Sequence, residues 1–278
     1  MIIWIPSYPK SGNTYLRSFL SSYYYSKDGK FDFNQLLNIN QFPAPRYSDT
    51  KAYTYVDAAK NWQNNQKKFF TKEKIFFLKT HNSLEEYFGY KFTNSSETLG
   101  AIYVVRDPRN VISSMCNHYS MSLNDAYNRM IDQNASLSLK DSEGDLNNFS
   151  FLGSWSNHYK SWKNNFEFKT LFIKYEDFEH NAYNEFWKIL TFIEELTGKN
   201  EPINKKKFEN SIESTNFSNV KREEKLHGFK EKLRYKKDNK INFFNLGFKN
   251  KWQEILPEEI SDKIKDKFFD ELKELKYE

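Results

Sequence analysis

The sequence predicts an α/β fold in one domain, with a central parallel sheet flanked by helices. Apolar runs with the composition of buried strands lie at residues 2–5, 75–78, 101–105 and 171–175. The segments between them are long enough for the helical crossovers that parallel strands require. The chain has 278 residues, which suits one such domain, and no repeat or low-complexity linker divides residues 1–278.

Helical patterns fill the gaps between these runs. Apolar residues at helical spacing predict helices at residues 15–25, 149–166 and 183–196 and in a last segment that opens at Pro257. Asp107 and Pro108 supply an N-cap and a first-turn proline for another helix that ends at about residue 121. The strands and helices therefore alternate along the chain, as a parallel sheet covered by helices requires.

Positive charge is concentrated in the C-terminal third. Residues 199–251 hold 15 Lys and Arg against 7 Asp and Glu, in a chain of net charge +5. Residues 216–242 are polar, charged and without clear periodicity, so we expect a basic flexible flap at about 216–250. This charge is either a solvated surface or a field that attracts a polyanionic ligand.

Composition also excludes several classes of protein. No run approaches the roughly 20 apolar residues of a membrane span, and residues 2–5 follow Met1 without a basic region or a cleavage site, which predicts a cytoplasmic protein. The single cysteine, Cys116, cannot form an internal disulfide, and its role stays open. With five scattered histidines, no Cys/His spacing suits zinc, so we expect no metal.

A loop rich in anion-binding groups follows the first predicted strand. Residues 8–14 read Tyr-Pro-Lys-Ser-Gly-Asn-Thr, and they present backbone N–H groups, hydroxyls and the Lys10 ammonium at a helix N-terminus, where phosphate binds well. The alternative is an ordinary strand-to-helix turn with a solvated lysine. The loop is not a Walker A motif, because Lys10 precedes Gly12, the only glycine of the loop.

This loop resembles the 5′-phosphosulfate-binding loop of the cytosolic sulfotransferase family. Further stretches resemble the same family in the same order: Lys79-Thr80-His81 is similar to its Lys-x-His sequence, residues 103–114 to its 3′-phosphate-binding stretch, and residues 175–177 to its Tyr-Glu-Asp sequence. Residues 243–252 align with a final family stretch that ends in tryptophan. On these stretches the chain is identified as a member of the family over residues 2–252.

The resemblance implies a reaction and a set of site residues. The donor would be 3′-phosphoadenosine 5′-phosphosulfate (PAPS), with 3′-phosphoadenosine 5′-phosphate (PAP) as product, and the acceptor a hydroxyl or amine of a small molecule or glycan. Catalytic roles fall on His81 as base and on Lys10 and Lys79. The residues implied to bind the donor are Lys10, Ser11, Gly12, Asn13, Thr14, Tyr15, Arg106, Ser114, Tyr175, Thr215, Phe217 and Gly247.

The position of these residues supports the assignment. Ligands of open α/β sheets bind beyond the carboxyl ends of the strands, and Lys10, His81 and Arg106 each follow a predicted strand. From the residues alone, however, Arg106 could equally pair with Asp107, and Tyr175 could equally be a core residue.

One stretch departs from the family pattern. Asn245 and Leu246 stand where the family has an Arg-Lys pair, and Arg222, Lys249 or Lys251 are the candidates to replace the missing charge. The dimerisation sequence that follows the tryptophan in the family is also absent, so monomer or dimer stays undecided.

Two other functions compete with sulfuryl transfer. A divergent P-loop nucleotide kinase or NTPase would need Mg²⁺ and acidic ligands for it, and no Walker B-like strand precedes residue 101. A non-catalytic polyanion-binding protein could bind nucleic acid or a charged glycan through residues 199–251, but it would have no use for His81 beside Lys79. We therefore expect a sulfotransferase that has no nucleic-acid partner, and the sequence leaves its acceptor open.

Overall fold

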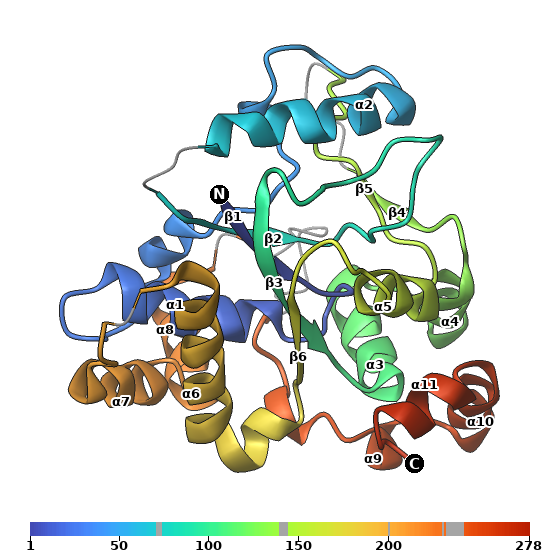
Figure 1. Ribbon diagram of the computed structural model, residues 1–278. Helices are drawn as coiled ribbons and strands as arrows, with labels where there is room; N and C mark the ends of the chain where they lie inside the picture. The colour runs from blue at the N-terminus through green and yellow to red at the C-terminus, as the bar shows by residue number, and fades with distance from the viewer. Residues whose placement is uncertain (71–73, 139–143, 200, 230, 232–241) are drawn as a thin grey trace.

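The fold is built on a parallel sheet that lies near the middle of the molecule (Figure 1). The computed structural model describes residues 1–70, 74–138, 144–199, 201–229, 231 and 242–278. The strands of the sheet run in the order β2-β1-β3-β6, and they are β1 (Ile2–Pro6), β2 (Phe76–Thr80), β3 (Thr98–Val105) and β6 (Thr170–Lys174). All neighbouring pairs are parallel. The predicted sheet and the predicted fold class are confirmed.

Helices cover both faces of the sheet (Figure 1). The α-helices of the described residues are α1 (Asn13–Tyr25), α2 (Tyr55–Gln66), α3 (Pro108–Tyr119), α4 (Leu123–Ile131), α5 (Trp155–Lys163), α6 (Asp177–Thr197), α7 (Lys205–Ser214), α8 (Phe217–His227), α9 (Trp252–Ile255), α10 (Glu258–Lys267) and α11 (Phe269–Glu274). Among them, none is both long and apolar enough to cross a membrane.

Alternate residues of each strand point to opposite faces, and this divides the core in two. Ile3 and Ile5 of β1 join a cluster with apolar residues of α1, α6 and α7. Ile2 and Trp4 of the same strand join a cluster on the other face with residues of α2, α3, α4, α5, α10 and α11. Because β1 is buried along its whole length, the loop that follows it starts from a fixed point.

Two helices differ from their predicted bounds for local reasons. The helix expected over residues 149–166 begins only at Trp155, because Ser154 caps it by accepting a hydrogen bond from the Asn157 N–H, and residues 150–151 form strand β5. That strand pairs with β4 (Ser136–Leu137). The last predicted helix is broken at Phe268 into α10 and α11.

Part of the predicted flap is helical, although the sequence of residues 216–242 shows no clear periodicity. Residues 217–227 form α8, which Asn216 caps by accepting from the Asn219 N–H. The helix has almost no apolar periodicity in its sequence, because it buries a single apolar side chain, Val220, together with the side chain of Glu224. Residues 230 and 232–241 of the predicted flap lie outside the described residues.

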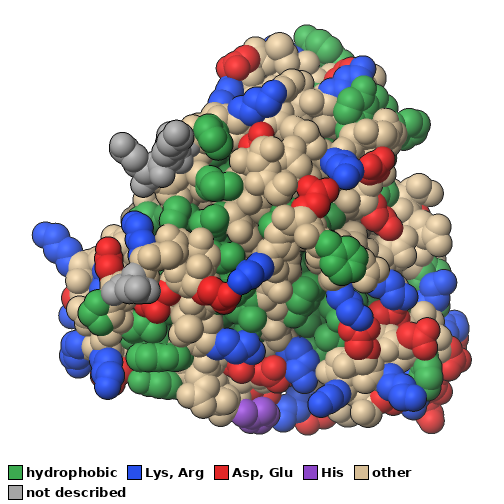
Figure 2. Space-filling model, in the orientation of Figure 1, with side chains coloured by type: hydrophobic (Ala, Val, Ile, Leu, Met, Phe, Trp, Pro, Cys, Tyr) green, Lys and Arg blue, Asp and Glu red, His purple; other side chains and the backbone are tan. Residues whose placement is uncertain are grey.

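Charges of both signs share the surface. On the face shown in Figure 2, Lys and Arg side chains are interspersed with Asp and Glu side chains. Lys163 pairs with Glu274, and Lys91 pairs with Glu167. The net positive charge of the chain is therefore not gathered into one patch on this face.

The packing of α6 on α1 should carry a large share of the stability. The Phe186 ring is completely buried and stacks on Phe19, with ring centroids 3.8 Å apart. Phe186→Ala should therefore lower the free energy of unfolding by about 3–5 kcal/mol, measured by urea denaturation. Phe166→Ala is the matched control, because that ring is 96% exposed and its loss should change stability by less than about 0.5 kcal/mol. Equal losses in the two variants would contradict the assigned core.

Candidate active site

A cavity of about 1310 Å³ opens at the carboxyl edge of the sheet. Its wall brings together residues that lie far apart in the sequence: Lys10 from the loop after β1 and Thr14 from the first turn of α1, Lys79 and His81 from the end of β2, and Arg106 and Ser114 from the end of β3 and from α3. Tyr175, Phe217 and Gly247 complete it. Parallel strands deliver these side chains to one edge because all their carboxyl ends point the same way.

The loop between β1 and α1 has an unusual backbone. Lys10 has φ 69° and Gly12 has φ 96°, both in the left-handed region. A Cβ atom on Gly12 would lie 2.1 Å from Cδ2 of Tyr175, so only glycine fits beneath that ring. The Asn13 side chain donates to the Ile5 carbonyl at 2.8 Å, which ties the loop back to β1. The loop is thus held in one shape that leaves the N-terminus of α1 facing the cavity.

The surroundings of Lys10 disfavour its charged form. Burial lowers its pKa to about 7, and the neighbouring charges of Lys79 and Arg106 act in the same direction. Its Nζ atom lies 4.2 Å from the centroid of the Phe243 ring. A bound anion would offset both the cost of burying the Lys10 charge and the repulsion between the like charges.

Arg106 lies against the loop and not against its acidic neighbour. Its Nη1 donates to the Lys10 carbonyl at 3.2 Å, and its Nη2 donates to the Gly247 carbonyl at 3.4 Å. The guanidinium lies 4.5 Å from the centroid of the Tyr175 ring. The Nε atom is buried and has no hydrogen-bond partner among the described residues. Arg106 therefore keeps donor capacity at the cavity.

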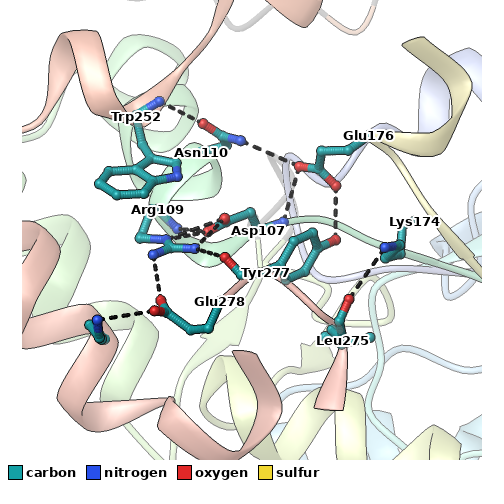
Figure 3. Close-up of polar contacts among 10 residues, drawn as sticks. Asp107, Arg109, Asn110, Lys174, Glu176, Trp252, Leu275, Tyr277 and Glu278 are labelled. Carbon is teal, nitrogen blue, oxygen red and sulfur yellow. Dashed lines mark hydrogen bonds and ion pairs between the residues drawn. The ribbon is translucent and has the colours of Figure 1, made fainter. Parts of the chain in front are cut away.

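Asp107 is taken by a different arginine. Figure 3 shows Arg109 bonded to Asp107 through Nε and Nη2, with distances of 2.8–3.2 Å. The same guanidinium reaches Glu278 at 2.7 Å and the Tyr277 carbonyl at 2.8 Å. The alternative in which Arg106 pairs with Asp107 is wrong, because the second arginine of the stretch satisfies that carboxylate.

A buried carboxylate that sequence reasoning missed connects the C-terminus to this region (Figure 3). Glu176 accepts from the Tyr277 hydroxyl at 2.8 Å, from the Asp107 N–H at 3.2 Å and from the Asn110 side chain at 3.3 Å. Asn110 in turn accepts from the Trp252 N–H at 2.9 Å. The signal for Glu176 was its place beside Tyr175, whereas nothing in the sequence singled out Asn110.

His81 is held with one ring nitrogen directed into the protein. Its Nδ1 lies 2.7 Å from the Ser7 carbonyl oxygen, which can only accept, so Nδ1 carries the proton and the lone pair is on Nε2. Burial and the charge of Lys79 hold the pKa of His81 well below its usual value. The ring is therefore neutral at physiological pH.

A second histidine supports the first. His158 Nε2 lies 3.1 Å from the carbonyl oxygen of His81, and its Nδ1 lies 2.8 Å from the Tyr103 hydroxyl. His158 must then donate to the carbonyl and accept from the tyrosine. This pair comes from α5 and β3 and fixes the backbone at His81.

The family model described as "Sulfotransferase domain" matches residues 2–276. This chain belongs to the sulfotransferase domain family. A comparison with curated protein sequences finds no match.

Solved structures share the fold of this sulfotransferase. The crystal structure of mouse sulfotransferase SULT7A1 complexed with PAP is 18% identical, with a TM-score of 0.60, and the alignment covers 98% of this chain and 84% of that one. Retinol dehydratase in complex with androsterone and inactive cofactor PAP is 16% identical, with a TM-score of 0.61 and coverage of 98% and 80%. Retinol dehydratase with retinol and PAP aligns equally well, with coverage of 98% and 81%.

Not all of the predicted donor-binding residues of the sulfotransferase line the cavity. Phe217 and Gly247 line the wall together, and Gly247 has φ 59° and would place a Cβ 2.6 Å from the Phe217 ring. Thr215 is buried and donates its hydroxyl to the Ser211 carbonyl at 2.7 Å. Within the described chain, Thr215 and Ser11 lie outside the cavity lining.

None of the predicted substitutes for the missing Arg-Lys pair reaches the lining that the described residues form. Arg222, Lys249 and Lys251 are exposed and lie outside it. A different lysine is near: Lys221 Nζ donates to the Asn245 carbonyl at 2.7 Å. Sequence reasoning missed Lys221, whose only signal is its place one turn into the helix that Phe217 begins.

The low pKa of Lys10 can be tested in the sulfotransferase without any nucleotide. Competitive acetylation followed by mass spectrometry should show half-maximal labelling of Lys10 near pH 7, because the amine is unprotonated above its lowered pKa. Lys263 is the control, since its ion pair with Glu259 at 2.7 Å raises its pKa and should delay labelling to more alkaline pH. Inorganic sulfate should shift the half-maximal labelling of Lys10 to higher pH. Half-maximal labelling of Lys10 and Lys263 at the same pH would contradict the assigned environment of Lys10.

Proposed function

We propose that this sulfotransferase uses PAPS as donor and transfers its sulfuryl group to a hydroxyl or amine of a small-molecule or glycan acceptor. The observation that carries the proposal is the convergence of Lys10, Lys79, His81 and Arg106 on one cavity at the sheet edge. The solved relatives that share the fold were crystallised with PAP, which is the desulfated form of this donor.

The two ends of the donor have separate candidate contacts. The N-terminus of α1 suits the phosphosulfate, because Lys10, Gly12, Asn13 and Thr14 line the cavity there and both a helix N-terminus and a lysine ammonium attract anions. Arg106 and Ser114 suit the 3′-phosphate, because both line the cavity and a guanidinium binds phosphate oxygens well. Phe217 lines the same end and offers an aromatic surface to a base.

The chemistry follows from the state of His81. Its Nε2 lone pair accepts the proton of the acceptor hydroxyl while that oxygen forms a bond to sulfur. The bond between sulfur and the bridging oxygen of the 5′-phosphate breaks in the same in-line step, and PAP leaves with the electron pair. Lys10 and Lys79 stabilise the negative charge that develops on the bridging and sulfuryl oxygens.

Nucleotide selectivity tests the donor. PAP should raise the melting temperature of the protein, with a stabilisation of about 2.7 kcal/mol at 100 times its Kd, whereas AMP and ATP at the same concentration should shift it much less. Arg106→Met should reduce the preference for PAP over AMP by about tenfold or more, because a charged hydrogen-bond donor to the 3′-phosphate is lost. Equal shifts by PAP, AMP and ATP would refute the donor assignment and favour a general nucleotide site.

Turnover tests the base. His81→Ala should lower kcat by about 10²- to 10⁴-fold, the usual contribution of a general base, and should leave the Kd for PAP within about threefold of wild type. His118→Ala is the matched control, because His118 lines the same cavity from α3 and has no role in the proposed step. The assignment fails if nucleotide binding collapses in His81→Ala or if the two variants lose equal activity.

A further inference from the structure

A three-membered ion cluster lies in the wall of the cavity. Arg17 Nη1 donates to both carboxylate oxygens of Glu231, at 2.8 and 3.1 Å. Lys79 Nζ reaches the same carboxylate at 3.5 Å. All three side chains line the cavity, and Glu231 follows Arg17 by 214 positions in the sequence. One carboxylate thus pairs with two buried cations in the wall of the proposed active site.

The two cations of this cluster are more deeply buried than the carboxylate. Arg17 has a side-chain exposure of 2% and donates through Nε and Nη2 to the Ile39 carbonyl, at 3.1 and 2.8 Å. Lys79 has a side-chain exposure of 10% and lies in β2, with its N–H bonded to the Asn40 carbonyl at 2.9 Å. Glu231, by contrast, is 33% exposed. The longer contact, from Lys79 to the carboxylate at 3.5 Å, is therefore the one that another anion can replace, while the bidentate contact of Arg17 holds Glu231 in place.

The carboxylate also lies within electrostatic reach of other groups that line the cavity. Its charge raises the pKa of Lys10, of His81 and of His118, in each case against the larger effect of burial. The cations Lys79 and Arg17 lower the pKa of Glu231 to about 2, so it is ionised at physiological pH. A full negative charge therefore lies beside Lys79, one of the two lysines proposed to stabilise the transferred sulfuryl group.

Resting on the function proposed above, we propose that Glu231 is an internal competitor of the donor's sulfuryl group for Lys79, and that it selects against PAPS relative to PAP. The single ammonium of Lys79 pairs with one of these two anions at a time. In the ligand-free protein the ammonium pairs with Glu231, and in the donor complex it pairs with the sulfuryl oxygens. After transfer the sulfuryl group has left with the acceptor, so Lys79 returns to Glu231 while PAP is still bound.

The selectivity has a simple electrostatic cause. PAPS carries a sulfuryl group beside Lys79, and its negative charge is disfavoured by a neighbouring carboxylate. PAP ends at the 5′-phosphate and carries no group at that subsite, so the carboxylate opposes it less. Arg17 keeps Glu231 close when Lys79 turns away, because its bidentate contact to the carboxylate does not involve Lys79.

Titration calorimetry with PAPS and PAP in the absence of acceptor tests the inference. Glu231→Gln keeps the shape of the side chain and removes its charge, and it should tighten PAPS binding by about tenfold while changing PAP binding by less than about twofold. Glu231→Asp restores the charge and should return the ratio of the two Kd values toward wild type.

The control is a second carboxylate of the same cavity. Glu223 lines the cavity with a side-chain exposure of 35% and pairs with Arg222 and His227, without contact to Lys79 or Arg17. Glu223→Gln should leave the PAPS to PAP ratio unchanged. The inference is overturned if Glu231→Gln weakens PAPS binding, or if it tightens PAPS and PAP equally. Failure of the wild-type protein to bind either nucleotide would instead overturn the proposed donor.

Discussion

The close approach of the Tyr175 ring to Gly12 is the contact on which the rest of the site depends. A Cβ on Gly12 would lie 2.1 Å from the ring, so the loop can take its shape only with glycine at that position. Tyr175 is placed by the sheet itself, since its N–H donates to the Val105 carbonyl at 2.8 Å, directly beyond β6. The ring also lies under the guanidinium of Arg106. One aromatic side chain therefore fixes both the loop after β1 and the arginine after β3.

Charge in the cavity is arranged so that an anion completes it. Lys10, Lys79, Arg106 and Arg17 all line one wall, and burial lowers the pKa of Lys10 and of Lys79. Cations held this way cost free energy in the empty protein, which an anionic ligand recovers on binding. In the ligand-free state the carboxylate of Glu231 offsets part of that cost at Arg17 and Lys79.

The frame behind the cavity is heavily hydrogen-bonded. Glu176, Asn110 and Arg109 connect the ends of β3 and β6 to Trp252 and to the last residues of the chain (Figure 3). A network of this kind resists distortion, because each of its polar groups is held by several hydrogen bonds at once. The C-terminal residues thus help to hold the edge of the sheet from which Arg106 projects.

The sequence by itself determined the sheet, the loop after β1 and the side chains at the strand ends, because apolar runs, a strand-to-helix loop and parallel topology are all local or nearly local properties. It also determined family membership through those same stretches. It failed where the signal depends on contacts distant in the chain. The pairing of Asp107 with Arg109, the burial of Thr215 and the approach of Lys221 to Asn245 follow from how elements pack and leave no periodic pattern. Only the tertiary structure placed Glu231 beside Arg17 and Lys79, because no local rule relates residues separated by more than half the chain.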